Sequence, residues 1–373
     1  MENNAMKTDD YWKGKRVFVT GHTGFKGAWL CHWLKRKGAI VHGYSKPQVE
    51  KCVLHGLLKN FGDNDQTFAD IRDFEALSNS LNSFKPEFIF HLAAQALVRS
   101  SYDDPLETWT TNLIGTANLI GTANLLEAVK SLTVAKLSIV LVTSDKVYEN
   151  REWDYPYREI DRLGGHDPYS ASKAAKEILA TSWNSSFFAK KHKHIRMATA
   201  RAGNVIGGGD WANDRIVPDL IQSNIDCRSL KLRNPNSTRP WQHVLEPLKG
   251  YLTLAQMLHD DKAPSGSSYN FGPNEESCTS VLNLVNMAFS VWPGKLELET
   301  QMLQKHEANK LSLSISKAAA ELNWRPVWDF KTTVGRTINW YKTVHEGGSA
   351  IQLCDEDIAE FERQIGNTER EMK

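Results

Sequence analysis

Short apolar segments alternate with amphipathic segments between Arg16 and Ala202. Six of the apolar segments have the length and the β-branched or aromatic content of buried strands. They read RVFVT, AIVHGY, QTFAD, EFIFHLAA, LSIVLVTS and IRMATARA. Between the first two lies AWLCHWLKRKG, whose apolar positions recur near helical spacing and which ends at Gly38 after a basic turn. Strands alternating with such helices predict βαβ units and a parallel sheet.

The composition changes from Gly203 onward, where Gly, Pro, Asn and Asp gather with Trp between them, as in GNVIGGGDWANDR. Such segments predict loops that line a site. We therefore expect an α/β fold: a Rossmann-type doubly wound parallel sheet with a smaller C-terminal substrate-binding lobe. The expected boundaries are 12–203 for the sheet domain and 204–360 for the lobe, with a return to the sheet domain in parts of 239–263.

A tandem hexapeptide interrupts this pattern. NLIGTA occurs at Asn112–Ala117 and again at Asn118–Ala123. Six extra residues lengthen a helix by about 9 Å and rotate whatever follows. We interpret the repeat as a local duplication absorbed by a bulge or a longer loop, in preference to a functional device.

The bulk composition excludes several classes of function. Apolar residues make up 41% and charged residues 24% of the 373-residue chain, and its net charge of +1 creates no field for nucleic acid or a membrane surface. The N-terminus is polar, and no apolar run is long enough to span a bilayer. Five scattered cysteines lack the spacing of a zinc site or a disulfide framework. We expect reduced thiols, no metal and a cytoplasmic location.

The first strand is followed at once by TGHTGFKGAW, in which three glycines are three residues apart. Gly21 would permit the tight turn, Gly24 the approach of a pyrophosphate to the backbone, and Gly27 the close packing of helix on strand. The helix that follows would direct free N–H groups at the phosphates. A strand before and a helix after the glycines is the context that a dinucleotide site requires.

The second strand ends in GYSKP, where a carboxylate for the adenosine ribose is usual but none is present. Lys46 would favour a 2′-phosphate, so this feature alone leaves NADP open. Asp70 and Ile71, after the third strand, are placed to hold the adenine edge. The small residues of His91–Ala94 would let a nicotinamide ribose pass closely.

A buried strand ends in VLVTSDKVYE, where Ser144, Asp145 and Lys146 follow an apolar run. An acid beside an amine at a strand end can be a structural ion pair or a general acid and base. For catalysis the amine must be neutral and the carboxyl protonated, although in water the proton prefers the amine by about 9 kcal/mol. A closed, dry pocket would narrow that gap, because burial penalises the ionised form.

A second chemical motif lies in DPYSASKAAKE, where Tyr169 and Lys173 are one helical turn apart. Asp167 and Pro168 suit the cap and first turn of that helix. A neighbouring cation favours phenolate, and lowering a tyrosine pKa from about 10 to near 7 requires roughly 4 kcal/mol, which a buried lysine and a nicotinamide charge could supply. YxxxK alone is common by chance, but with Ser144 it forms a set.

These motifs together resemble the extended short-chain dehydrogenase/reductases that act on nucleotide sugars. GHTGFKGAWL, VTSDKVYEN, DPYSASK, RAGNVIGGGDWANDRIVPD, RNPNSTRPWQHVLEPLKGYL and YNFGPN most resemble the family of CDP-glucose 4,6-dehydratases, and the likeness covers nearly the whole chain. The departures are the hexapeptide repeat, Val147 in place of a frequent cysteine and Ala171 in place of a frequent asparagine. None of them changes an ionisable group.

The resemblance implies NAD as cofactor and a role for each catalytic candidate. Tyr169 would take the proton of the sugar 4-hydroxyl while hydride leaves C4, with Ser144 bonded to the same oxygen and Lys173 holding Tyr169 and the ribose. Lys146 would remove the C5 proton, and Asp145 would protonate the departing 6-hydroxyl. The hydride would return to C6. Epimerases of the same superfamily lack the acid and base pair.

The remaining expected contacts fall into two groups. Cofactor contacts are expected from the glycine turn, the strand ends and the catalytic helix: Gly21, Thr23, Gly24, Phe25, Lys26, Gly27, Ser45, Asp70, Ile71, Leu92, Ala93, Ala94, Asn112, Tyr169 and Lys173. Substrate contacts are expected from planar guanidinium donors suited to a diphosphate and from polar residues near the sugar: Gln95, Arg99, Asn204, Arg215, Arg239 and Asn270.

Three interpretations therefore stand. The first is an NAD-dependent dehydratase of CDP-glucose. The second is a dehydratase or 4-epimerase of another nucleotide sugar, which as an epimerase would need no Asp145–Lys146 pair. The third is a non-catalytic dinucleotide-binding protein, against which the intact Ser144, Tyr169 and Lys173 argue. The superfamily likeness implies a homodimer or homotetramer, with neither nucleic acid nor membrane as a partner.

Overall fold

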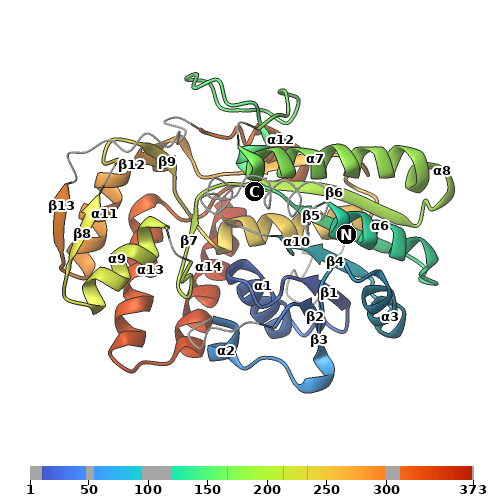
Figure 1. Cartoon of the computed structure of the whole chain (residues 1–373), viewed down its shortest axis with the longest axis horizontal. Coiled ribbons are helices and arrows are strands. Elements are labelled where there is room, and N and C mark those ends of the chain that lie inside the picture. Colours follow the sequence, from blue (N-terminus) through green and yellow to red (C-terminus); the bar gives the residue numbers. More distant parts are fainter. Residues whose placement is uncertain are drawn as a thin grey trace.

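A computed structural model describes residues 11–47, 54–94, 119–165, 167–212, 214–232, 234–298 and 311–371. A seven-stranded sheet forms its centre (Figure 1). In spatial order its strands are β11 (Ser268–Phe271), β6 (Ile195–Ala202), β5 (Leu137–Val142), β4 (Phe88–His91), β1 (Arg16–Thr20), β2 (Ile40–Ser45) and β3 (Gln66–Phe68). All neighbours pair in parallel. The six expected strands are present, and β11 is an addition that the sequence pattern did not indicate.

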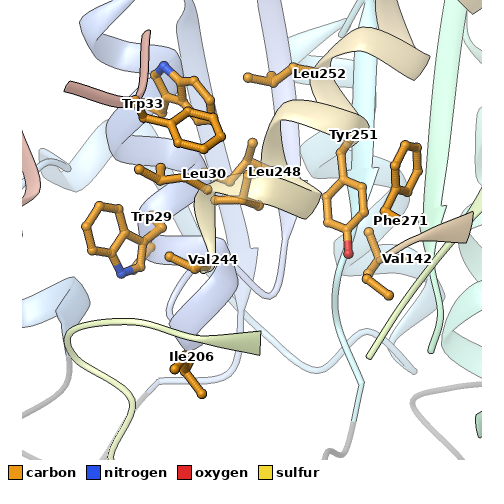
Figure 2. Close-up of a cluster of buried hydrophobic side chains, with 14 of the residues drawn as sticks. Trp29, Leu30, Trp33, Val142, Ile206, Val244, Leu248, Tyr251, Leu252 and Phe271 are labelled. Atoms are coloured by element: carbon orange, nitrogen blue, oxygen red, sulfur yellow. The ribbon is translucent and has the colours of Figure 1, made fainter. Parts of the chain in front are cut away.

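Helices cover both faces of this sheet, which confirms the doubly wound α/β fold. One apolar cluster includes α1 (Phe25–Arg36) and α10 (Leu245–His259). The other includes α3 (Phe74–Phe84), α6 (Ile120–Ala128) and α7 (Pro168–Trp183). Figure 2 shows part of the first cluster, with Trp29, Leu30 and Trp33 of α1 near Leu248 and Leu252 of α10.

The uninterrupted apolar run of β5 follows from this burial. Val140 and Val142 join the cluster on one face of the sheet, whereas Ile139 and Leu141 join the cluster on the other. A strand covered on both faces has no polar face, so its sequence does not alternate. Polar side chains can therefore enter this region only where the strand ends.

The rest of the chain contributes short strand pairs and helices. The pairs are β7 (Val205–Ile206) with β10 (Gln242–His243), β8 (Ser229–Leu232) with β13 (Lys295–Leu298), and β9 (Thr238–Pro240) with β12 (Cys278–Ser280). The remaining helices are α2 (Leu54–Leu58), α8 (Ala189–Lys191), α9 (Ile216–Ile225), α11 (Val281–Val291), α12 (Ser316–Leu322), α13 (Phe330–His345) and α14 (Ala350–Glu371). Figure 1 shows the β8–β13 pair at the edge of the molecule, far from the central sheet.

The chain returns to the sheet domain twice after residue 203. Helix α10 lies within the expected range 239–263, but β11, which pairs with β6, lies beyond it and inside the segment expected to belong to the lobe. Across the described ranges, no helix combines the length and the apolar character needed to cross a membrane. In the second copy of the hexapeptide, Ile120–Ala123 form the start of α6, and the first copy lies outside the described residues.

The order of strands reverses between β1 and β4. From β1 the chain proceeds to β2 and β3 on one side, and then crosses to β4, β5 and β6 on the other. Ligands of open parallel sheets bind at the carboxyl ends of the strands at such a reversal. Gly21 and Ala93 follow β1 and β4 there, so the glycine turn occupies this position.

Candidate active site

The glycine turn is shaped by close backbone approaches. Gly21 has φ +75°, and a Cβ atom on it would lie 2.8 Å from the backbone nitrogen of Ala93. A Cβ atom on Gly27 would lie 2.1 Å from the carbonyl oxygen of Gly21. At Gly24, the N-cap of α1, the nearest atom would be 3.4 Å away, and no side chain caps the helix there. The turn therefore leaves an open approach to the α1 N-terminus, which fits a pyrophosphate.

Polar residues at the ends of β2 and β3 surround the outer part of this turn. The hydroxyls of Thr23 and Ser45 lie 2.9 Å apart. The Asp70 carboxylate binds Arg72 at 2.6 Å and Lys46 at 2.7 Å, and these cations hold its pKa well below the usual range. Lys46, the residue that left NADP open, is therefore engaged by a carboxylate. Ile71 is buried behind Asp70.

The turn after β5 carries three of the expected catalytic residues. Ser144 caps the short 3₁₀ turn Asp145–Val147: its Oγ accepts from the Lys146 backbone N–H at 3.0 Å and donates to Asp145 Oδ1 at 2.9 Å. Asp145 is only 3% exposed. A Cβ atom on Gly203 would lie 2.1 Å from Asp145 Oδ2, so the absence of a side chain at position 203 makes room for this carboxylate.

Helix α7 brings the other two catalytic candidates to the same place. As expected, Asp167 is its N-cap, accepting from the Ser170 N–H at 2.9 Å, and Pro168 is its first residue. The Lys173 amine lies 5.5 Å from the centre of the Tyr169 ring, and the Lys146 amine lies 5.9 Å from it. The Ser144 hydroxyl is a hydrogen-bond partner of the Tyr169 phenol. The structure thus brings all five residues together.

The structure gives the ionisation of Tyr169 without a cofactor. Burial, followed by the negative charge of Asp145, raises the pKa of Tyr169 to about 12, while Arg215 and Ser144 act in the opposite direction. Burial, followed by the charge of Lys26, lowers the pKa of Lys173 to about 7. The expected phenolate depends also on the charge of a bound nicotinamide, so it stays a prediction for the protein with its cofactor.

Among the expected substrate contacts, Arg215 acts electrostatically on this cluster. Its guanidinium donates to Asp210 Oδ2 at 2.7 Å, and its charge lowers the pKa of both Tyr169 and Lys26. Asn204, with φ +26°, follows Gly203 at the end of β6. Arg239 lies on β9, half-buried, and donates to the Thr238 carbonyl at 2.9 Å.

The position of Asn270 contradicts its expected role in substrate binding. It lies on β11 and is fully buried. Its Oδ1 accepts from the Tyr148 hydroxyl at 2.8 Å, and its Nδ2 donates to the carbonyls of Tyr157 and Ser314. Asn270 therefore links core elements and has no exposed surface for a ligand.

Several expected contacts remain to be placed. Leu92, Ala93 and Ala94 follow β4 and are partly exposed at the edge of the sheet, next to the glycine turn. Phe25 and Lys26 begin α1, and burial, followed by the charge of Arg215, lowers the pKa of Lys26 to about 8. Gln95, Arg99 and Asn112 lie outside the described residues. The four described cysteines are free thiols, Cys31, Cys227, Cys278 and Cys354.

Sequence reasoning missed the residues that hold the site from behind. Gly203 was used only to mark a change in composition, although it borders Asp145. Glu177 and Arg201, a buried ion pair at 2.6 Å, were not singled out at all. Glu177 is one helical turn beyond Lys173, which is the one local signal that could have suggested it.

Comparison with known proteins identifies the family of this chain. The family model of GDP-mannose 4,6 dehydratase matches residues 18–337. The chain belongs to this family. This member of the GDP-mannose 4,6 dehydratase family is 43% identical over 356 residues to the CDP-glucose 4,6-dehydratase of Salmonella typhimurium (strain LT2), a match that covers 94% of this chain and 97% of the relative. The resemblance stated from the motifs is confirmed.

More distant relatives and solved structures agree with the fold of the family. A probable dTDP-glucose 4,6-dehydratase of Sinorhizobium fredii is 25% identical, with 87% of this chain and 92% of the relative covered. The structure of dTDP-glucose 4,6-dehydratase from Bacillus anthracis in complex with NAD aligns with a TM-score of 0.71 at 20% identity, over 91% of this chain and all of the other. A Thermus thermophilus UDP-glucose 4-epimerase in complex with NAD aligns with a TM-score of 0.73 at 22% identity, over 88% and 99%.

A buried lysine behind the site predicts a pH-dependent stability. Lys176 is fully buried and donates to the Val142 carbonyl at 3.2 Å; burial and the charge of Lys173 lower its pKa well below 10.5. The unfolded chain therefore binds the extra proton, and stability rises with pH up to the unfolded pKa. We expect Lys176→Met to raise Tm by a few degrees near pH 7, and by less at pH 9.5. Thermal melts at both pH values test this.

The exposed Lys331 on α13 provides the control for this measurement. Lys331→Met removes the same charge from a solvated site and should change Tm little at either pH. A gain for Lys176→Met that is equal at both pH values would contradict the assignment of a neutral, buried amine.

Proposed function

We propose that this chain is an NAD-dependent CDP-glucose 4,6-dehydratase, a hydro-lyase that converts CDP-D-glucose to CDP-4-keto-6-deoxy-D-glucose and water for the synthesis of deoxysugars. The observation that carries the proposal is the convergence of Asp145 and Lys146 on the Ser144–Tyr169–Lys173 group at one strand end. The 43% identity to a CDP-glucose 4,6-dehydratase supports the choice of nucleotide.

The residues at the carboxyl ends of β1, β2 and β4 suit NAD. The turn Gly21–Gly27 holds the pyrophosphate at the α1 N-terminus, where the partly exposed ammonium of Lys26 adds positive charge. Thr23, Ser45, Asp70 and Ile71 line the adenosine side, while Leu92–Ala94, Asn112, Tyr169 and Lys173 serve the nicotinamide side. When bound, NAD accepts a hydride from the substrate and returns it within the same turnover.

Tyr169 is the base for the sugar 4-hydroxyl. Burial and the charge of Asp145 raise the pKa of its phenol to about 12, so the phenol holds its proton when no cofactor is bound. A bound oxidised nicotinamide, together with Lys173 in its protonated form, would lower this pKa, and the phenol would release its proton to solvent and then accept the 4-hydroxyl proton as a phenolate. Ser144 bonds the same sugar oxygen and so orients it. Once C4 is a ketone, the C5 proton is acidic.

Lys146 and Asp145 then carry out the elimination: Lys146 removes the C5 proton, and Asp145 protonates the 6-hydroxyl, which leaves as water. Among the described residues no ion pair joins the two side chains. The Asp145 carboxyl is bonded to Ser144 and lies against Gly203, whereas the Lys146 amine lies near the Tyr169 ring. This separation favours two distinct roles over a structural ion pair.

The substrate contacts follow from the same geometry. Arg215 is a guanidinium whose charge acts on Tyr169, and Arg239 is a second candidate for the diphosphate. Asn204, Gln95 and Arg99 are assigned to the sugar nucleotide. We assign 12–203, together with α10 and β11, to the NAD-binding domain and most of 204–360 to the substrate lobe. The enzyme acts as a cytoplasmic homodimer or homotetramer, with free thiols as support for a reducing compartment.

The proposed function predicts a substrate preference and no net reduction of cofactor. Incubation with NAD and CDP-glucose, dTDP-glucose or GDP-mannose should give 4-keto product rapidly from CDP-glucose alone. Because the hydride is returned, free NADH should not accumulate. Product analysis by chromatography with absorbance of the solution checks both points. Release of one NADH per product would indicate a simple dehydrogenase, and faster turnover of another nucleotide sugar would reassign the substrate.

Removing the proposed base, Lys146, should stop the reaction after the oxidation at C4. Lys146→Ala retains Tyr169 and Ser144, so oxidation at C4 continues while the C5 proton has no acceptor. We expect the reduced-cofactor absorbance to appear on the enzyme with excess CDP-glucose, and the yield of 4-keto-6-deoxy product to fall about 10²- to 10⁴-fold. Tyr169→Phe should block both events. If Lys146→Ala turned over at the parent rate, Lys146 and Asp145 would have no catalytic role and would be only neighbouring charges at a strand end.

A substitution at Gly203 tests the role of Asp145 as the acid without removing any ionisable group. A methyl group at this position overlaps the Asp145 carboxylate, so Gly203→Ala should displace it and slow elimination by at least about tenfold, while NAD binding stays unchanged. Gly335→Ala in α13 is the matched control, since its new methyl group meets nothing within 4 Å. Equal product rates for the two variants would remove Asp145 from the reaction.

A further inference from the structure

A buried ion pair lies directly behind the catalytic residues. Glu177 of α7 and Arg201 of β6 join through Oε2 and Nη2 at 2.6 Å and through Oε1 and Nε at 2.9 Å. Their side chains are only 2% and 3% exposed. Burying such a pair removes water from two charges, so it is tolerated only with good geometry and further hydrogen bonds. The residues that make those hydrogen bonds show which parts of the chain the ion pair connects.

The carboxylate of this pair is hydrogen-bonded to the residue that precedes the Ser144–Val147 turn, which carries the proposed acid and base. Glu177 Oε1 accepts from the Thr143 hydroxyl at 2.6 Å, and Thr143 immediately precedes Ser144. Oε2 accepts from Thr199 at 2.9 Å and from Ser268 at 3.2 Å, which ties the carboxylate to β6 and β11 as well. Hydrogen bonds to a charged acceptor are the strong ones, so Thr143 is firmly fixed.

The guanidinium holds the end of the same turn. Arg201 Nη1 donates to the Tyr148 hydroxyl at 2.7 Å, and Tyr148 immediately follows Val147. The Tyr148 hydroxyl in turn donates to Asn270 Oδ1 at 2.8 Å. The guanidinium carbon also lies 4.9 Å from the centre of the Tyr148 ring. These contacts give a role to Asn270, which has no access to substrate.

We propose that the Glu177–Arg201 pair positions the Ser144–Val147 turn against the catalytic helix by fixing both of its ends. Glu177 lies eight residues after Tyr169 on α7, about 12 Å along the helix axis, so the helix that carries Tyr169 and Lys173 also carries the anchor of the turn. One pair thus sets the distance between Tyr169, the base for the oxidation step, and the acid and base of the elimination step. Thr143, Tyr148, Glu177 and Arg201 are positioning residues.

The two anchors should affect different halves of the reaction, an expectation that rests on the proposed function. Tyr148→Phe loosens the end of the turn nearer to Lys146, so elimination should slow more than oxidation and reduced cofactor should build up on the enzyme. Thr143→Val loosens the end at Ser144, so oxidation itself should slow. Displacements of about 1 Å can cost on the order of 10²-fold in rate, and we expect kcat to fall about 10- to 100-fold with KM unchanged within about twofold.

The variants are chosen so that the fold survives. Glu177→Gln or Arg201→Met would leave an unpaired buried charge, whereas Tyr148→Phe and Thr143→Val remove only one hydroxyl each. Tyr269→Phe is the matched control: Tyr269 is a buried tyrosine like Tyr148, but its hydroxyl bonds Glu321 at 2.7 Å and not the groups that hold the turn. Thr143→Ser retains the hydroxyl and should restore the rate lost in Thr143→Val.

A measurement without substrate separates this proposal from the proposed function. Hydrogen–deuterium exchange of the peptide covering 143–150 should be faster in Tyr148→Phe and Thr143→Val than in the parent protein or Tyr269→Phe. Failure of the parent protein to convert CDP-glucose would refute the proposed function and leave this exchange result to stand. Unchanged exchange in both variants, or kinetics no different from those of Tyr269→Phe, would overturn the positioning role.

Discussion

The central constraint on this molecule is that its parallel sheet is covered on both faces. Every side chain within β5 is buried, so chemistry is confined to the points where strands stop. The glycine turn after β1, the Ser144 turn after β5 and the Gly203 corner after β6 all lie at the same edge of the sheet for this reason. A cofactor and a sugar can meet there because parallel strands end side by side.

The edge is also rich in amines. Lys26, Lys146, Lys173 and Lys176 lie in or behind the site, and burial together with neighbouring positive charges lowers the pKa of Lys26, Lys173 and Lys176. An anionic ligand favours the protonated form of nearby amines, so the pyrophosphate that we propose to bind at this edge would raise the pKa of Lys26 and Lys173 again.

Much of the fold and the site could be predicted from local patterns. The six strands, the Gly21–Gly27 turn and the Asp167 cap each depend on residues close together in sequence, and each was found where expected. Long-range packing was not predictable. β11 is only four residues long, and Asn270, in a glycine- and proline-flanked segment, resembled a binding residue. The YxxxK motif also says nothing about the surroundings of the Tyr169 phenol, which raise its pKa. Arg201 sits within an apolar strand, and its partner Glu177 is 24 positions away.

The late position of β11 in the chain has a consequence for folding during synthesis. Until residues 268–271 emerge from the ribosome, β6 is an edge strand with unpaired backbone groups. The bond from Tyr148 to Asn270 also cannot form before then, so the Ser144–Val147 turn lacks part of its support while the first six strands are already complete. A nascent chain in this window presents the unpaired backbone groups of β6, at which a strand of another molecule can pair.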